Sequence, residues 1–230
     1  MPTYPEIYAH HAERYDELVR HEDHERHVAA ALEAAFPGRP GEPTLAVELG
    51  CGTGRVTRLL APLVSEVRAY DGSEHMIQKA RALVSGVLFF VADNASLPEP
   101  DGVADLIVAG WTLGHLTGFF PGEWEPRARA ALGEMLRVAR PGATLIVLET
   151  LGTCVEAPAP PNPGLAAFYA LLEGAFGFAR RTLSTDYAFS SVEEAERIMG
   201  FFFGQAMAEK VRARGSKLVP EWTGLWRLAR

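Results

Sequence analysis

The sequence predicts an α/β domain with a parallel sheet and helices on both faces of that sheet. Between residues 44 and 148, short apolar runs alternate with amphipathic helical segments. The first apolar run leads directly into a glycine-rich stretch, and no segment repeats at a period of roughly 20–50 residues. Strand–helix alternation implies right-handed crossovers within one sheet. In such a sheet, ligands bind outside the carboxyl ends of the strands.

Length and charge restrict the classes of partner. The 230 residues suit one domain of this kind, and the net charge of −7 argues against binding nucleic acid or an anionic membrane through a basic face. The longest apolar runs, such as 87–92, are far short of the roughly 18 residues of a membrane span. Residues 1–11 lack a signal-peptide pattern. We therefore expect a cytoplasmic protein without a nucleic-acid or membrane partner, its oligomeric state left open.

Two residue types raise the question of a metal site. Cys51 and Cys154 are too few for a disulfide framework or a thiolate site. Five histidines lie near the N-terminus: His10, His11, His21, His24 and His27. Histidines three positions apart can share a helix face, but a third at i+6 drifts off that face. The pattern favours a solvated, titratable face and no metal.

Hydrophobic periodicity predicts the elements of the first 150 residues. Apolar residues at helical spacing predict a helix over 6–36, and the segment 37–43, rich in proline and glycine, predicts a linker. Strands are expected at 44–49, 67–70, 87–92, 104–109 and 144–148, and helices at 54–63, 74–84 and 127–139.

The last third of the chain has a different pattern. A proline-rich loop at 157–164 leads into a helix over 165–178 and a strand over 182–189. Ser191 and Glu194 have the spacing of a capping box that opens further helix, and a last strand is expected at 218–228. We predict a single domain, 1–230, with an N-terminal helical lid (1–40), a ligand-binding core (41–150) and a C-terminal half (151–230). That half carries a helical insertion at about 157–180 and final antiparallel strands.

A glycine-rich loop follows the first strand. Gly50, Gly52 and Gly54 stand between a buried strand and a helix, where they let the backbone turn tightly and approach a ligand. Glu48 precedes them as an acceptor. A dinucleotide-binding loop has the pattern G-x-G-x-x-G, whereas Arg55 occupies the place of its third glycine. This departure disfavours a nicotinamide cofactor, and a glycine turn without a ligand is the plain alternative.

Acidic residues end the second and third strands. A carboxylate at Asp71 can accept both hydroxyls of a ribose, and the alternative role as helix N-cap suits Ser73 better. Asp93, beside the exposed amides of Asn94 and Ala95, can read the edge of an adenine. Its alternative is to close an Asx turn. Together with the glycine loop, these residues favour an adenosine-bearing ligand at three neighbouring strand ends.

These residues resemble the motifs of the class I S-adenosylmethionine-dependent methyltransferases. Residues 48–54 resemble the first motif of that family, 105–116 its fourth motif, and 137–143 the segment entering its fifth strand. Residues 8–16 resemble the opening helix of small-molecule members. The likeness covers about residues 4–150. It implies a Rossmann-like three-layer sandwich with a seven-stranded, mostly parallel sheet and an antiparallel last strand.

The resemblance also implies a role for each matched residue. The cofactor would be S-adenosyl-L-methionine, and the product S-adenosyl-L-homocysteine. The implied binding residues are Tyr8, Tyr15, Glu48, Gly50, Cys51, Gly52, Gly54, Asp71, Gly72, Met76, Asp93, Asn94, Ala95, Ala109, Gly110 and Trp111. Of these, the tyrosines would lie over the cofactor, the loop glycines beside its methionine part, Met76 near adenine, and 109–111 beneath the sulfonium.

A sulfonium methyl group is already activated, so such a protein chiefly aligns the acceptor for in-line attack and excludes water. A base is needed only where the acceptor must lose a proton. His115 is the candidate catalytic base, because its intrinsic pKa suits that work; a structural histidine at a loop–helix junction is the alternative.

The function expected is methyl transfer to a small-molecule acceptor, which the acidic composition favours over RNA or protein methylation. A non-catalytic module that only binds S-adenosylmethionine is an alternative that the same residues would allow.

Overall fold

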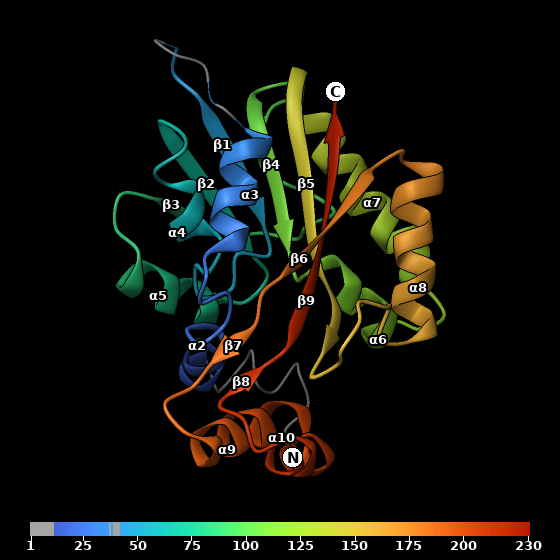
Figure 1. Ribbon diagram of the computed structural model, residues 1–230. Helices are drawn as coiled ribbons and strands as arrows, with labels where there is room; N and C mark the ends of the chain where they lie inside the picture. The colour runs from blue at the N-terminus through green and yellow to red at the C-terminus, as the bar shows by residue number, and fades with distance from the viewer. Residues whose placement is uncertain (1–11, 37, 39–41) are drawn as a thin grey trace.

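A seven-stranded sheet forms the centre of the computed structural model, which describes residues 12–36, 38 and 42–230 (Figure 1). Its strands are β1 (Leu45–Leu49), β2 (Glu66–Asp71), β3 (Leu88–Val91), β4 (Ala104–Gly110), β5 (Ala139–Thr153), β6 (Ala179–Ser184) and β9 (Glu221–Ala229). They are ordered β3-β2-β1-β4-β5-β9-β6. Strands β3 to β5 pair in parallel, and β9 is antiparallel to both β5 and β6. The predicted sheet is confirmed.

Helices cover both faces of the sheet. One layer holds α3 (His27–Ala35), α4 (Thr57–Leu60) and α5 (Glu74–Leu83), and the other holds α7 (Trp124–Val138) and α8 (Pro163–Ala170). In β1, Val47 packs with the α7–α8 layer and Ala46 with the α3–α5 layer, as the two-residue period of a strand requires. A strand covered on both faces is apolar over most of its length, which explains the apolar run 106–109 within β4. The three-layer α/β architecture is confirmed.

The N-terminal helix expected over 6–36 is broken in the structure. It consists of α2 (Ala12–Val19) and α3, separated by a turn in which Asp23 and Arg26 have φ of 53° and 62°. The Asp23 carboxylate accepts the amides of His27 and Val28 at 2.7 and 2.9 Å. A side chain that hydrogen-bonds to nearby backbone offers the chain an alternative to helix. The apolar residues on either side of the turn both have helical spacing, so hydrophobic periodicity alone predicts one continuous helix. Residues before Ala12, including Tyr8, His10 and His11, lie outside the described residues.

Two of the histidines expected on a solvated face are partly buried and also contact the backbone. The Nδ1 atoms of His21 and His27 lie 2.9 and 2.7 Å from the backbone oxygens of Ala188 and Ser184. His24 is exposed. These two rings therefore attach the turn between α2 and α3 to the end of β6 and to β7 (Tyr187–Ala188).

The C-terminal third differs from expectation in where the extra structure lies. The helix expected as an insertion is α8 continued by a π-helical turn (Leu171–Ala175), and it forms the crossover from β5 to β6. The segment that leaves the sheet is 185–220: a pair of short strands, β7 (Tyr187–Ala188) and β8 (Leu218–Val219), encloses α9 (Val192–Phe203) and α10 (Gln205–Arg214). Pro220, which has no N–H to donate, separates β8 from β9.

Helix α2 packs against α9 beyond one end of the sheet, with Leu18, Ile198 and Phe202 in a common apolar cluster (Figure 1). We call α2, α9, α10 and the β7–β8 pair the cap. Two short helical pieces, η1 (Leu113–His115) and α6 (Leu116–Phe119), follow β4 on the same side. No helix in the described part of the chain is long and apolar enough to cross a membrane. The division into a single domain with an N-terminal lid stays a prediction.

Candidate active site

The loop after β1 packs tightly against its neighbours. Gly50, Gly52 and Gly54 have φ of 65°, 54° and 86°, a region that favours glycine. A Cβ at Gly50 would overlap the Thr112 hydroxyl and lie 2.5 Å from the Thr112 Cβ, and a Cβ at Gly54 would lie 2.8 Å from Val84. At Gly52 the nearest atom, in the Tyr15 ring, would be 3.7 Å away. Two of the three glycines are therefore required by packing, and Gly52 leaves space beside Tyr15.

A cavity of about 280 Å³ opens beside this loop, and we call it the glycine-loop cavity. The predicted site residues that line it are Tyr15, Gly50, Gly52, Asp71, Gly72, Met76, Asn94, Gly110, Trp111 and His115. They follow the carboxyl ends of β1, β2, β3 and β4 or come from the cap and the helices behind those ends. The strand order reverses between β1 and β4, so the cavity lies at the switch point where such sheets bind ligands.

Asp71 is turned toward the glycine loop. Its Oδ2 accepts the Gly52 amide and its Oδ1 accepts the Ser73 amide, both at 2.8 Å. Ser73, not Asp71, caps α5 by accepting the Met76 amide. Burial raises the pKa of Asp71, and the two amides oppose that rise. Because each carboxylate oxygen has two lone pairs, Asp71 can still accept hydroxyl groups from a ligand.

Several predicted binding residues do not line the glycine-loop cavity: Glu48, Cys51, Gly54, Asp93, Ala95 and Ala109. Glu48 is buried and accepts the Thr57 hydroxyl at 2.6 Å, and burial raises its pKa to about 8. Asp93 is exposed and accepts the Ala95 amide at 2.9 Å, which is the Asx turn considered as its alternative role. Cys51 and Ala109 are buried. The binding roles of these residues, and of Tyr8 outside the described residues, stay predictions.

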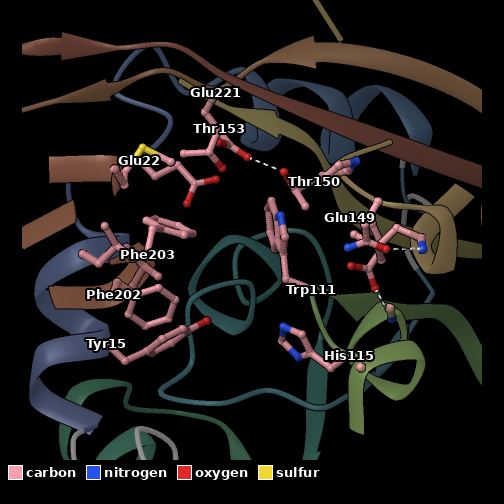
Figure 2. Close-up of a pocket in the computed structure, with 18 of the residues that line it drawn as sticks. Tyr15, Glu22, Trp111, His115, Glu149, Thr150, Thr153, Phe202, Phe203 and Glu221 are labelled. Atoms are coloured by element: carbon pink, nitrogen blue, oxygen red, sulfur yellow. Dashed lines mark hydrogen bonds between the residues drawn. The ribbon is translucent and has the colours of Figure 1, made fainter. Parts of the chain in front are cut away.

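A second cavity, of about 390 Å³, lies between the cap and the ends of β5 and β9 (Figure 2). We call it the cap cavity. Four residues line both cavities: Tyr15, Trp111, His115 and Phe119. The cap cavity has an apolar wall that includes Leu18, Val19, Leu165, Phe202, Phe203 and Met207. Its polar lining includes Glu22, Arg55, Glu149, Thr150, Thr153, Tyr187 and Glu221. The four shared residues form the junction between the cavities.

Arg55, which the sequence offered only as a departure from a dinucleotide loop, connects three parts of the site. Its Nη2 lies 2.6 Å from Glu22 Oε1, and its guanidinium lies 3.5 Å from the centre of the Trp111 ring. It also hydrogen-bonds the Tyr15 hydroxyl. Burial raises the pKa of Glu22, and Arg55 opposes that rise. Trp111 has φ of 49°, which is an uncommon backbone state for a bulky residue. The guanidinium stacked on its ring helps to hold the Trp111 side chain at the junction.

His115, which the sequence predicts as the catalytic base, lies at the junction between the two cavities. Its ring stacks on Phe119 with centroids 5.6 Å apart. Burial lowers its pKa to about 4, so the imidazole is neutral near pH 7. A neutral ring can accept a proton, but a base with so low a pKa holds that proton weakly.

Glu149 is a buried residue of the site that the sequence analysis missed. Its Oε1 accepts the Gly114 amide at 2.7 Å, and the amides of Thr112 and Leu113 also bond to its carboxyl. Burial raises its pKa to about 8, against the effect of these amides. Glu149 thus ties the turn that carries His115 to the end of β5. The signal was an acidic residue at a strand end, the same signal that identified Asp71.

Comparison with known proteins agrees with this geometry. A family model described as methyltransferase domain matches residues 47–147. Trans-aconitate 2-methyltransferase of Streptomyces coelicolor is 34% identical over 136 residues, which is 55% of this chain and 44% of that protein. Malonyl-[acyl-carrier protein] O-methyltransferase of Salmonella typhimurium is 32% identical over 126 residues, 55% of this chain and 46% of that protein. The chain therefore spans less than half the length of these curated relatives.

Among solved structures, the YcgJ protein of Bacillus subtilis superposes with a TM-score of 0.57 at 16% identity, covering 89% of this chain and 98% of that one. The strand order, the antiparallel last strand and the glycine loop define a class I methyltransferase fold. Over residues 47–147, the chain is therefore similar to methyltransferase domains in sequence, and over most of its length it is similar to them in fold.

Proposed function

We propose that this protein transfers a methyl group from S-adenosylmethionine to a small-molecule acceptor and releases S-adenosylhomocysteine. The observation that carries the proposal is the junction: Tyr15, Trp111, His115 and Phe119 line both the glycine-loop cavity and the cap cavity. Two ligands bound in these cavities would meet there. Methyl transfer needs such an arrangement, because the acceptor atom must approach the methyl carbon in line with the breaking bond to sulfur.

The residues of the glycine-loop cavity fit S-adenosylmethionine. Both oxygens of Asp71 keep a lone pair for ribose hydroxyls, and an added Cβ at Gly72 would meet nothing within 4 Å. Gly50 and Gly52 present bare backbone to the methionine part, and buried Met76 offers adenine an apolar surface. When bound, S-adenosylmethionine supplies a methyl group already activated on a sulfonium. The residues of the chain then align the acceptor and exclude water.

The cap cavity supports a small acceptor over RNA or protein. It holds about 390 Å³ and is bounded on one side by the apolar cap residues Leu18, Phe202 and Phe203, a form typical of small-molecule sites. The relatives are named for different acceptors, trans-aconitate and a malonyl-acyl carrier protein. His115 stays the candidate base for an acceptor that must lose a proton.

Calorimetric titration with S-adenosylmethionine, S-adenosylhomocysteine and NADH tests the cofactor. We expect saturable binding of the first two and none of NADH, because Arg55 replaces the third glycine of a dinucleotide loop. Binding of NADH alone would contradict the proposal.

Turnover separates an enzyme from a non-catalytic binding module: formation of S-adenosylhomocysteine that depends on an added acceptor supports catalysis. Cofactor binding without turnover on any of a broad acceptor set favours the module.

The protonation state of His115 can be measured directly. Following the ring Cε1–H by NMR, we expect a titration midpoint near the pKa of about 4. Since the unfolded chain binds this proton at a higher pH than the folded protein, stability falls as pH falls from about 6.5 toward 4. A midpoint at or above 6.5 would mean that water or a carboxylate reaches the ring. The His115→Gln variant, which has no ring to titrate, identifies the signal.

A further inference from the structure

The cap cavity collects more acidic than basic side chains. Glu22, Glu149 and Glu221 line it and are buried. Among the described residues that line it, Arg55 is the sole lysine or arginine. A buried carboxyl group is costly unless it is paired or hydrogen-bonded, so each of the three acids needs partners.

Two of the three acids have their partners within the protein. Glu22 pairs with Arg55 at 2.6 Å and is hydrogen-bonded by Tyr187. Glu149 accepts the Gly114 amide. Arg55 is engaged on both sides, by Glu22 and by the Trp111 ring. The cavity therefore offers an incoming ligand no uncommitted guanidinium.

Glu221 is the acid whose partners are incomplete. Its Oε1 accepts the Thr150 hydroxyl at 2.7 Å. The Thr153 hydroxyl also hydrogen-bonds the carboxyl group, while Oε2 is buried and accepts no hydrogen bond of standard geometry from the described residues. Burial raises the pKa of Glu221 well above its ordinary value, and Glu22 raises it further. The titratable groups around Glu221 are Glu22, Arg55, Tyr169, Tyr187 and Asp186.

Glu221 lies across the cap cavity from the catalytic junction. In Figure 2, Glu22, Thr153 and Glu221 stand on one side and His115 on the other, with Trp111 between them. Apolar side chains such as Phe202 and Phe203 flank this space. A ligand that spans it needs a polar head at Glu221, an apolar body, and its nucleophilic atom at the far end, near His115.

We propose that the cap cavity selects an acceptor with a protonated amine, whose ammonium group is held by Glu221 through Oε2 with the Thr150 and Thr153 hydroxyls beside it. The inference rests on the proposed function, because it names the class of acceptor for the same site. The ammonium is the recognition group and lies away from the atom that is methylated. It supplies a charged donor to Oε2 and a positive charge to a lining in which acidic side chains outnumber basic ones.

The same arrangement disfavours acceptors that end in a carboxylate. Such a group would face Glu22 and Glu221 across a cavity whose guanidinium is already paired. Like charges in a desolvated site repel strongly. A neutral alcohol can donate a hydrogen bond to Oε2 but carries no charge, so its affinity should lie between those of the amine and the carboxylate.

Three probes of similar shape test this order: 2-phenylethylamine, 2-phenylethanol and 3-phenylpropanoate. Each is titrated calorimetrically near neutral pH into the protein, with and without saturating S-adenosylhomocysteine. We expect the amine to bind about tenfold more tightly than the alcohol, since a charge-assisted hydrogen bond is roughly twice as strong as one between neutral groups. The carboxylate should bind most weakly.

The Glu221→Gln variant should lose about tenfold in amine affinity and little in alcohol affinity. Glu99→Gln is the matched control: Glu99 is also buried, but it is bound by Arg68 and Tyr70 away from both cavities, and its substitution should leave the ranking unchanged. The wild-type ranking needs no variant, so the test holds even if Glu221→Gln fails to fold.

The outcomes separate this inference from the proposed function. A carboxylate that binds as tightly as the amine, an amine preference that survives Glu221→Gln, or no detectable binding of the amine overturns the inference while S-adenosylhomocysteine still binds. Failure of S-adenosylhomocysteine to bind the wild-type protein counts against the proposed function, whatever the ranking of the three probes.

Discussion

Replacing Asp71 with alanine is expected to lower the affinity for S-adenosylhomocysteine by about 100-fold or more. The proposed contacts are two hydrogen bonds from ribose hydroxyls to a carboxylate, each contributing about 1.5–3 kcal/mol. The substitution also frees the Gly52 and Ser73 amides that Asp71 now accepts at 2.8 Å, so the loop loses its shape. Calorimetric titration of both proteins measures the change.

Two further variants locate the cause. Asp71→Asn keeps one oxygen acceptor and should lie between alanine and the wild type in affinity. Asp101→Ala removes an exposed carboxylate that pairs with Arg137 and should bind S-adenosylhomocysteine as the wild type does. An Asp71→Ala protein that is folded and still binds with unchanged affinity would remove Asp71 from the site.

Asp93→Ala, measured beside it, decides whether that exposed acid has the adenine-reading role predicted from the sequence.

The glycine-loop cavity was predictable because its residues follow a local rule. Gly50, Asp71, Asn94 and Trp111 each come shortly after a strand that hydrophobic periodicity identifies. The carboxyl ends of parallel strands meet at one edge of the sheet, so residues distant in sequence become neighbours once the strand order is known. The same rule, applied to the fifth strand, identifies Glu149.

The cap was not predictable in this way, because long-range contacts determine it. The break between α2 and α3 depends on Asp23, whose amide donates to the Thr185 carbonyl at 3.1 Å, and on His27, whose ring lies 2.7 Å from the Ser184 carbonyl. Periodicity in 12–35 carries no trace of these partners. Local sequence patterns predict which face of a helix is apolar, but they do not predict which distant residues pack against that face.

The charged lining of the cap cavity has the same origin. Glu22 and Glu221 come from opposite ends of the chain and face one group of side chains only in the folded protein. In the sequence, Arg55 is only a departure from the dinucleotide-loop pattern. In the folded protein, it pairs with Glu22 and stacks on Trp111. The sequence therefore predicted much of the lining of the glycine-loop cavity, and tertiary structure was needed for the charged lining of the cap cavity.

Replacing Gly50 with alanine is expected to destabilise the protein by about 2–5 kcal/mol, from overpacking and the left-handed backbone together. The new Cβ would overlap the Thr112 hydroxyl at φ of 65°. Relief requires the loop or the start of the β4–α6 connection to move, and either movement deforms the glycine-loop cavity. Urea unfolding measures the stability, and binding of S-adenosylhomocysteine should be lost in the protein that remains folded.

Gly72→Ala is the matched variant that separates stability from binding. A Cβ at Gly72 would meet nothing within 4 Å, and its φ is outside the left-handed region, so stability should change by no more than about 0.5 kcal/mol. Gly72 nevertheless lines the cavity, and a methyl group there takes space from the ligand. We expect S-adenosylhomocysteine affinity to fall by about tenfold or more, which is about 1.4 kcal/mol. Unchanged affinity in Gly72→Ala would mean that the cofactor lies elsewhere, because a ligand that fills this cavity cannot also share it with the added side chain.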